Sequence, residues 1–202
     1  GSEEMVFRVG SVPLPPYIHQ KLADAERYQT VFNQSPGSAA APTAGLHFTP
    51  EVISALHGKG VKTAFVTLNV GLDTFRPLTV DDAAEHQMHG EECSISPETA
   101  TLVNDCPGRV IAVGTTTTRT LESHAVARRK IEPGSQHTHI FINPGYDFKV
   151  IDGLLTNFHM PRTTMLLMLS ALVGSKNLMN GYAEAVQHEY RFLSFGDAML
   201  IL

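Results

Sequence analysis

Apolar positions along the chain alternate between short β-branched runs and stretches with helical spacing. The β-branched runs predict strands over 61–70, 109–113, 138–142, 148–155 and 198–202. Helical spacing after polar caps predicts helices that begin near residues 50, 97, 118 and 161, with a last helix around 182–190. Strands alternating with helices in this way predict an α/β fold, with a largely parallel sheet flanked by helices.

Two of the predicted helix starts share the same chemistry. Thr49-Pro50-Glu51 and Ser96-Pro97-Glu98 each offer a hydroxyl cap, a proline for the first helical position and an acid for the first turn. A third helix, at 165–173, is apolar almost all round, so we expect it to be the most buried helix. It is far shorter than the roughly 20 residues that a membrane-spanning helix needs.

Composition narrows the class of protein. The 202 residues carry a net charge of -5, and 43% of them are hydrophobic, which excludes global disorder. Two cysteines exclude a disulfide scaffold and indicate a reducing compartment, so we expect a cytoplasmic protein. Residues 1–4 are interpreted as an expression scar or a disordered start, and residues 5–202 as the α/β domain. The mild acidity argues against a broad polyanion-binding surface, although Arg128-Arg129-Lys130 could form a local one.

The segment 42–48, PTAGLHF, is the first candidate site. Pro42, Thr43 and Gly45 belong to a run of small residues that lets the backbone approach a ligand closely. His47 adds an imidazole, the side chain that acts most often as a general acid or base, directly before a helix N-terminus that favours anions. The alternative is a tight structural loop.

Two further junctions follow predicted strands. Gly114, Thr115 and Thr116 lead from a strand into a helix, and with Arg119 they could bind an anion or ribose hydroxyls. This pattern is neither a P-loop nor a GxGxxG fingerprint, and a well-capped helix explains it equally well. Arg76 follows another strand, where it could pair with a carboxylate or phosphate.

His86, His89 and Glu91 form a third candidate. A general acid/base set or donors to a substrate is the favoured interpretation. A metal site is the weaker one, because no second histidine or cysteine pair completes a tetrahedral ligand set. An ordinary polar loop is the remaining alternative.

The last candidates lie near the end of the chain. Asn157 and His159 stand between a predicted strand and the apolar helix, where a site is expected in an α/β sheet. Asp197 follows Gly196 and could serve a site or simply a turn.

Read together, the segments resemble a known family. In order, they are LPPY, ERYQTVF, GSAAAPTAGLHFT, VGLDTFRP, HQMHGE, AVGTTTTRTLES, PGYDFKVIDGLLTNFHMPR and YRFLSFGDAMLI. Over 11–202 the chain closely resembles the carboxy-terminal part of the S-adenosylmethionine:tRNA ribosyltransferase-isomerases of queuosine biosynthesis.

The resemblance implies transfer and isomerisation of the ribosyl unit of S-adenosylmethionine. The acceptor would be 7-aminomethyl-7-deazaguanine at the wobble position of tRNA, and the product epoxyqueuosine-tRNA. It implies no metal or redox cofactor and no membrane, and we favour a monomer. We expect His47, His86, His89 and Glu91 to line the reacting centre, with the other candidate residues binding substrate.

The chain also departs from the family pattern. Family members carry a small β-barrel domain, which we expect to be absent from this chain, and Asn69 and Asp73 replace a histidine and a glycine found in many members. The alternative function is therefore a shortened, divergent homologue without transferase activity that binds nucleoside, RNA or a protein partner. A metal-dependent hydrolase built on His86, His89 and Glu91 is a third possibility.

Overall fold

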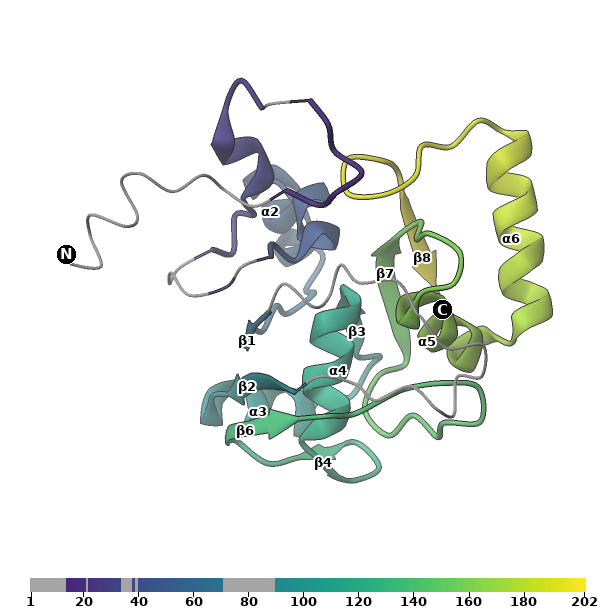
Figure 1. Ribbon diagram of the computed structural model, residues 1–202. Helices are drawn as coiled ribbons and strands as arrows, with labels where there is room; N and C mark the ends of the chain where they lie inside the picture. Colours follow the sequence, from purple (N-terminus) through teal and green to yellow (C-terminus); the bar gives the residue numbers. More distant parts are fainter. Residues whose placement is uncertain (1–13, 21, 34–37, 39, 71–89) are drawn as a thin grey trace.

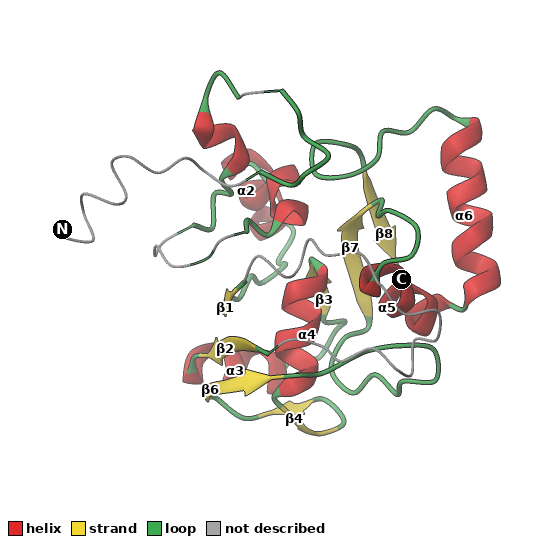
Figure 2. Ribbon diagram, in the orientation of Figure 1, coloured by secondary structure: helices red, strands yellow, loops and turns green. Residues whose placement is uncertain are grey.

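A computed structural model describes residues 14–20, 22–33, 38, 40–70 and 90–202. Small sheets and helices alternate through this part of the chain, as Figures 1 and 2 show. The 3₁₀ helices are η1 (Ala25–Tyr28) and η2 (Thr43–His47). The α-helices are α2 (Pro50–Gly58), α3 (Pro97–Asn104), α4 (Thr115–Ser123), α5 (Thr164–Val173) and α6 (Ser175–Gln187). None of the helices described is long and apolar enough to cross a membrane.

The strands of the described residues form two three-stranded sheets and a hairpin. One sheet has the order β1-β2-β6, from β1 (Val66–Asn69), β2 (Glu91–Ile95) and β6 (Gly134–Thr138), and all its pairs are antiparallel. The other has the order β3-β7-β8, from β3 (Ile111–Val113), β7 (Gly153–Asn157) and β8 (Ala198–Ile201). The hairpin pairs β4 (Ala125–Ala127) with β5 (Lys130–Ile131).

The prediction of a mixed α/β fold is confirmed, but the prediction of a largely parallel sheet is wrong. Within the described residues only β3 and β7 pair in parallel. The reason lies in the connections: α3 leads from β2 in one sheet to β3 in the other. A crossover helix enforces parallel strands only when it returns the chain to the same sheet.

Helix α4 forms the centre of the fold. It contacts strands of both sheets, and five consecutive residues, Thr118–Glu122, are buried in it. The surrounding core includes Ala112 of β3, Leu154 of β7 and Leu169 of α5. The first turn of α4 thereby has a fixed position relative to the parallel pair β3 and β7.

The helix starts at Thr49 and Ser96 were predicted correctly, whereas α4, α5 and α6 begin at Thr115, Thr164 and Ser175 and not near residues 118, 161 and 182. The hydroxyl of Thr49 accepts from the backbone N–H of Val52 at 3.3 Å, and that of Ser96 accepts from Thr99 at 3.2 Å. The prediction that helix 165–173 is the most buried is wrong, because only Met168 and Leu169 are buried in α5. Helix α5 packs against α6, and its remaining side chains are only half-buried.

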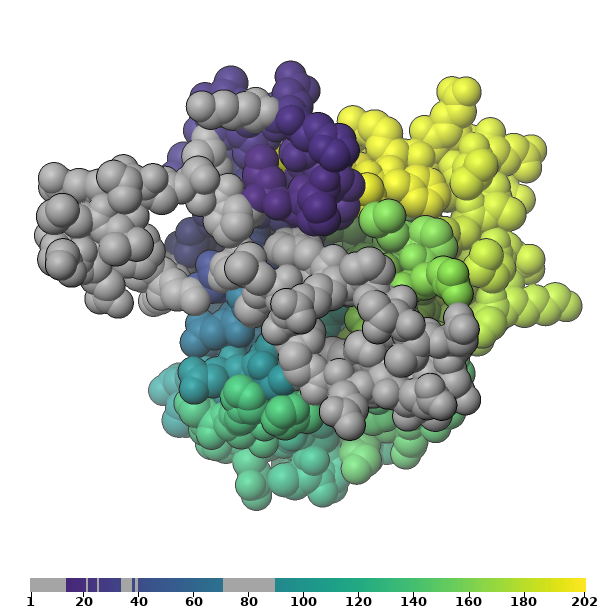
Figure 3. Space-filling view, viewed as in Figure 1, coloured from purple at the N-terminus to yellow at the C-terminus, as the bar shows by residue number. Residues whose placement is uncertain are grey.

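Segments from the two ends of the chain lie side by side. Figure 3 shows the segment around η1 against the segment that precedes β8. The hydroxyls of Tyr17 and Ser194 are 2.7 Å apart, and the rings of Tyr28 and Phe195 pack edge to face. This contact holds both segments near the carboxyl end of β7.

Candidate functional site

The site is built at the carboxyl ends of the two parallel strands. Val113 of β3 pairs with Leu155 of β7, so both strands end at the same edge of the sheet. Directly beyond, the backbone N–H of Gly114 donates to the carbonyl of Leu155 at 2.8 Å. Asn157, the last residue of β7, is 3% exposed at this edge. Ligands of open α/β sheets bind at such edges.

The 3₁₀ helix η2 lies against this edge through a chain of three side chains. Nε2 of His47 is 2.7 Å from Oδ1 of Asn157, and Nδ2 of Asn157 donates to the hydroxyl of Thr43 at 2.9 Å. Because the amide oxygen faces the imidazole, Nε2 carries the proton. Nδ1 of His47 then holds a lone pair, as a general base requires.

Glycine is required at two positions in these segments for different structural reasons. Gly114 has a φ of +90°, which side chains rarely adopt, and a Cβ there would lie 3.6 Å from that of Ala44 in η2. At Gly45 a Cβ would lie 3.0 Å from Thr30 and 3.2 Å from Phe32. Gly45 therefore serves close packing within the protein, while Gly114 serves the sharp turn from β3 into α4 at the site.

Helix α4 begins directly after Gly114. Thr115 and Thr116 are half-buried there, and the backbone N–H of Thr118 donates to the carbonyl of Gly114 at 3.2 Å. The N-terminus of a nine-residue helix presents backbone N–H groups and a partial positive charge. The structure thus brings the junction 114–116 together with His47 and Asn157.

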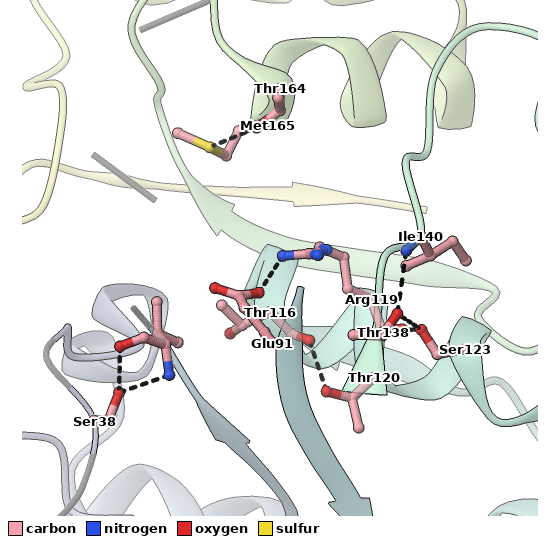
Figure 4. Close-up of polar contacts among 11 residues, drawn as sticks. Ser38, Glu91, Thr116, Arg119, Thr120, Ser123, Thr138, Ile140, Thr164 and Met165 are labelled. Carbon is pink, nitrogen blue, oxygen red and sulfur yellow. Dashed lines mark hydrogen bonds and ion pairs between the residues drawn. The ribbon is translucent and has the colours of Figure 1, made fainter. Parts of the chain in front are cut away.

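Glu91 and Arg119 form a buried ion pair one turn further along α4, drawn in Figure 4. Glu91 is 2% and Arg119 is 7% exposed. The sequence placed Glu91 with His86 and His89, and Arg119 with the threonines. Their pairing shows that the segment beginning at Glu91 is joined directly to α4.

Asp197 directly precedes β8 and is held by Arg191. The carboxylate accepts from the backbone N–H of Arg191 and from its guanidinium, both at 2.7 Å. These hydrogen bonds, and to a smaller extent the imidazole of His47, hold the pKa of Asp197 below its ordinary value. Sequence reasoning missed Arg191, although an acid six residues later across a glycine turn was a usable signal.

His159 is not brought into the cluster. Its Nε2 is 2.7 Å from the hydroxyl of Thr156, and its backbone N–H donates to the hydroxyl of Tyr182 on α6. Successive side chains of a strand point to opposite faces, so Thr156 and Asn157 face apart. Burial lowers the pKa of His159 to about 4. Its assignment to the substrate site remains a prediction.

Two grooves lie elsewhere on the described surface. One, of about 730 Å³, is lined by Phe65, Leu102 and neighbouring residues of the antiparallel sheet and α3. The other, of about 300 Å³, is lined partly by Leu46, Phe48 and Phe195. Neither groove is lined by a predicted site residue. We therefore locate the candidate site by the chemistry of the residues at the end of β7 and not by the position of a groove.

Three predicted site residues, Arg76, His86 and His89, lie outside the described residues. Pro42 precedes η2, and its carbonyl accepts from the backbone N–H of Gly45 at 2.8 Å. Within the described part of the chain, no three His, Cys, Asp or Glu side chains form a group that could hold a metal ion.

Comparison with known proteins shows which family the chain belongs to. The chain is similar to the crystal structure of S-adenosylmethionine tRNA ribosyltransferase from Thermotoga maritima, with 43% sequence identity and a TM-score of 0.63. The match covers 79% of this chain and 51% of that one, so this chain spans about half the length of that protein. The sequence profile of the family described as "Queuosine biosynthesis protein" matches residues 2–201. The chain therefore belongs to the queuosine biosynthesis protein family.

Proposed function

We propose that the protein transfers and isomerises the ribosyl unit of S-adenosylmethionine onto 7-aminomethyl-7-deazaguanine in the wobble position of tRNA. The product would be epoxyqueuosine-tRNA, with adenine and methionine released. Family membership and the similarity to the S-adenosylmethionine tRNA ribosyltransferase from Thermotoga maritima support this proposal. The observation that carries it to particular residues is the hydrogen-bonded chain from His47 through Asn157 to Thr43.

The proposed reaction requires a base beside the sulfonium. Removal of a proton from the ribose carbon next to sulfur is followed by loss of adenine and attack by the amine of the deazaguanine. His47 is our candidate for the base, because Asn157 fixes the proton on Nε2 and leaves the Nδ1 lone pair for the substrate. His86 and His89 are proposed to serve proton transfer, with Glu91 lining the same centre.

Substrate binding is assigned to the surrounding groups. The N-terminus of α4 and the hydroxyls of Thr115 and Thr116 suit ribose hydroxyls or an anionic group. We further propose that Asp197 and Arg76 contact substrate. The proposal involves S-adenosylmethionine as co-substrate, tRNA as acceptor, and no metal or redox cofactor.

The test is incubation of the protein with S-adenosylmethionine and tRNA that carries the deazaguanine precursor. Nucleoside analysis by mass spectrometry should show epoxyqueuosine, and adenine should be released in equal amount. His47→Gln should lower turnover about 10²–10⁴-fold. His57→Gln is the matched control, because His57 is exposed on α2, where its Nε2 lies 2.9 Å from the hydroxyl of Thr63.

Two outcomes would count against the proposal. Binding of tRNA without release of adenine would favour the alternative of a homologue that binds but does not transfer. Full turnover of His47→Gln would move the proton transfer to another residue and remove the role proposed for η2.

A further inference from the structure

Arg119 has an unmatched hydrogen-bonding edge. Its Nη1 donates to the carboxylate of Glu91, as Figure 4 shows. Its Nε and Nη2 are enclosed, and neither has a hydrogen-bond partner in the described part of the chain. The residue as a whole is 7% exposed, so water is not its ordinary partner.

This edge has a defined chemical preference. The N–H groups of Nε and Nη2 lie on one side of the planar guanidinium and are parallel, which matches the two oxygens of a carboxylate. Buried polar groups in proteins are nearly always hydrogen-bonded, and leaving two donors of a charged group unpaired is costly. A buried guanidinium edge with two unpaired donors indicates a ligand that accepts both hydrogen bonds.

The place of the edge in the fold indicates an anion of small size. Thr116 and Arg119 are three residues apart on α4 and so lie on one face of the helix, with Thr116 in the first turn, where the partial charge is positive. A phosphate of an RNA backbone is reached mainly by exposed donors on a protein surface. A terminal carboxylate on a flexible chain can enter a buried site instead.

Glu91 adds the opposite charge directly beside this edge. Its carboxylate offers about four lone-pair positions, so it can accept from Arg119 and from other donors together. A guanidinium and a carboxylate held side by side match the two charged groups of an α-amino acid. The carboxylate of the ligand would meet Arg119, and its ammonium would meet Glu91.

We propose that the ion pair of Arg119 and Glu91 binds the amino-acid end of S-adenosylmethionine, with the α-carboxylate on Nε and Nη2 of Arg119. This inference rests on the function proposed above and assigns the methionine subsite within it. It places the amino-acid end against α4, with the sulfonium and ribose toward the carboxyl end of β3.

The test compares two ligands by isothermal titration calorimetry. Decarboxylated S-adenosylmethionine keeps the adenosine, the sulfonium and the amine but lacks the α-carboxylate. The protein should bind S-adenosylmethionine about 10–100-fold more tightly than this analogue, the usual range for charge-assisted hydrogen bonds. Arg119→Lys keeps the charge but loses the edge, so it should bring the two affinities within about threefold of each other.

Two more variants sharpen the result. Glu91→Gln should weaken the binding of both ligands by similar factors, because both carry the ammonium group. Arg129→Lys is the matched control: Arg129 pairs with Asp152 at the amino end of β7, whereas the site lies at its carboxyl end, so the replacement should leave the affinity ratio unchanged.

Equal affinity of the unaltered protein for both ligands would overturn the inference and leave the proposed function standing. Binding of neither ligand would overturn both proposals. An unchanged ratio in folded Arg119→Lys would also refute the subsite. If circular dichroism shows that this variant is unfolded, the comparison of the two ligands on the unaltered protein still decides the question.

Discussion

The imidazole of His47 and the side-chain amide of Asn157 are hydrogen-bonded at 2.7 Å although 110 residues separate them in the sequence. His47 ends η2, and Asn157 ends β7. A glutamine or leucine at 157 would not fix the ring in this way, because the short amide reaches both His47 and Thr43 from the strand end. The contact therefore sets which imidazole nitrogen can act as a base.

Asn157→Ala should release the imidazole of His47. In the unaltered protein, ¹⁵N-resolved NMR of the histidine ring should show the neutral form protonated at Nε2. In the variant the two tautomers should mix, and turnover should fall by about 10–100-fold because orientation of the base is lost. A variant that keeps the same tautomer would show that another group orients His47.

Gly114→Ala should destabilise the turn between β3 and α4. The backbone φ of +90° at Gly114 is unfavourable for a residue with a Cβ, so the free energy of unfolding should fall by about 1–3 kcal/mol. Gly58→Ala is the control, since a Cβ at Gly58 meets nothing within 4 Å at the end of α2. Equal effects of the two changes in urea denaturation would contradict this account.

Glu122 holds the segment before β7 and should be essential for stability. It is 4% exposed and accepts from the backbone N–H groups of Lys149, Val150 and Ile151 at 2.9–3.1 Å. Glu122→Ala leaves these buried donors unpaired and should cost about 3 kcal/mol or more.

Glu132→Ala, at an exposed acid, serves as the control for loss of a negative charge and should change stability by less than about 0.5 kcal/mol. The measurement is the free energy of unfolding from urea titration at constant pH and salt. A small effect of Glu122→Ala would mean that water replaces the carboxylate in the segment.

The sequence predicted local features better than connections between them. Thr49 and Ser96 cap helices where expected, because capping depends on a few adjacent residues. Strand β2 was missed because it begins with two acidic residues, Glu91 and Glu92, which are not typical of strands. The alternating burial of its side chains becomes clear only in the structure. The predicted strand 148–155 begins instead at Gly153, because Glu122 takes the backbone donors that a strand would need.

The site was predicted as separate segments, and the structure joins some of them. Gly114, His47 and Asn157 were named for their chemistry, but nothing local in the sequence shows that η2 lies against β7. The pairing of Glu91 with Arg119 was missed for the same reason. Long-range pairing depends on how the two sheets share α4, which spacing along the chain does not reveal.

The stability of the protein should fall as the pH falls from about 6.5 to about 4 because of His159. Burial lowers the pKa of His159 from 6.5 to about 4 in the folded state. Between these values the unfolded chain binds a proton that the folded chain does not, so acid favours unfolding. The loss should approach about 3 kcal/mol at the acid end of this range.

Other groups also titrate in this range, so the informative quantity is the difference in the free energy of unfolding between the unaltered protein and His159→Gln, whose amide can still contact Thr156. That difference should change with pH in this window and be constant above pH 7.5. A difference for His159→Gln that does not change with pH would show that the pKa of His159 is the same in the folded and unfolded states, and that burial does not lower it.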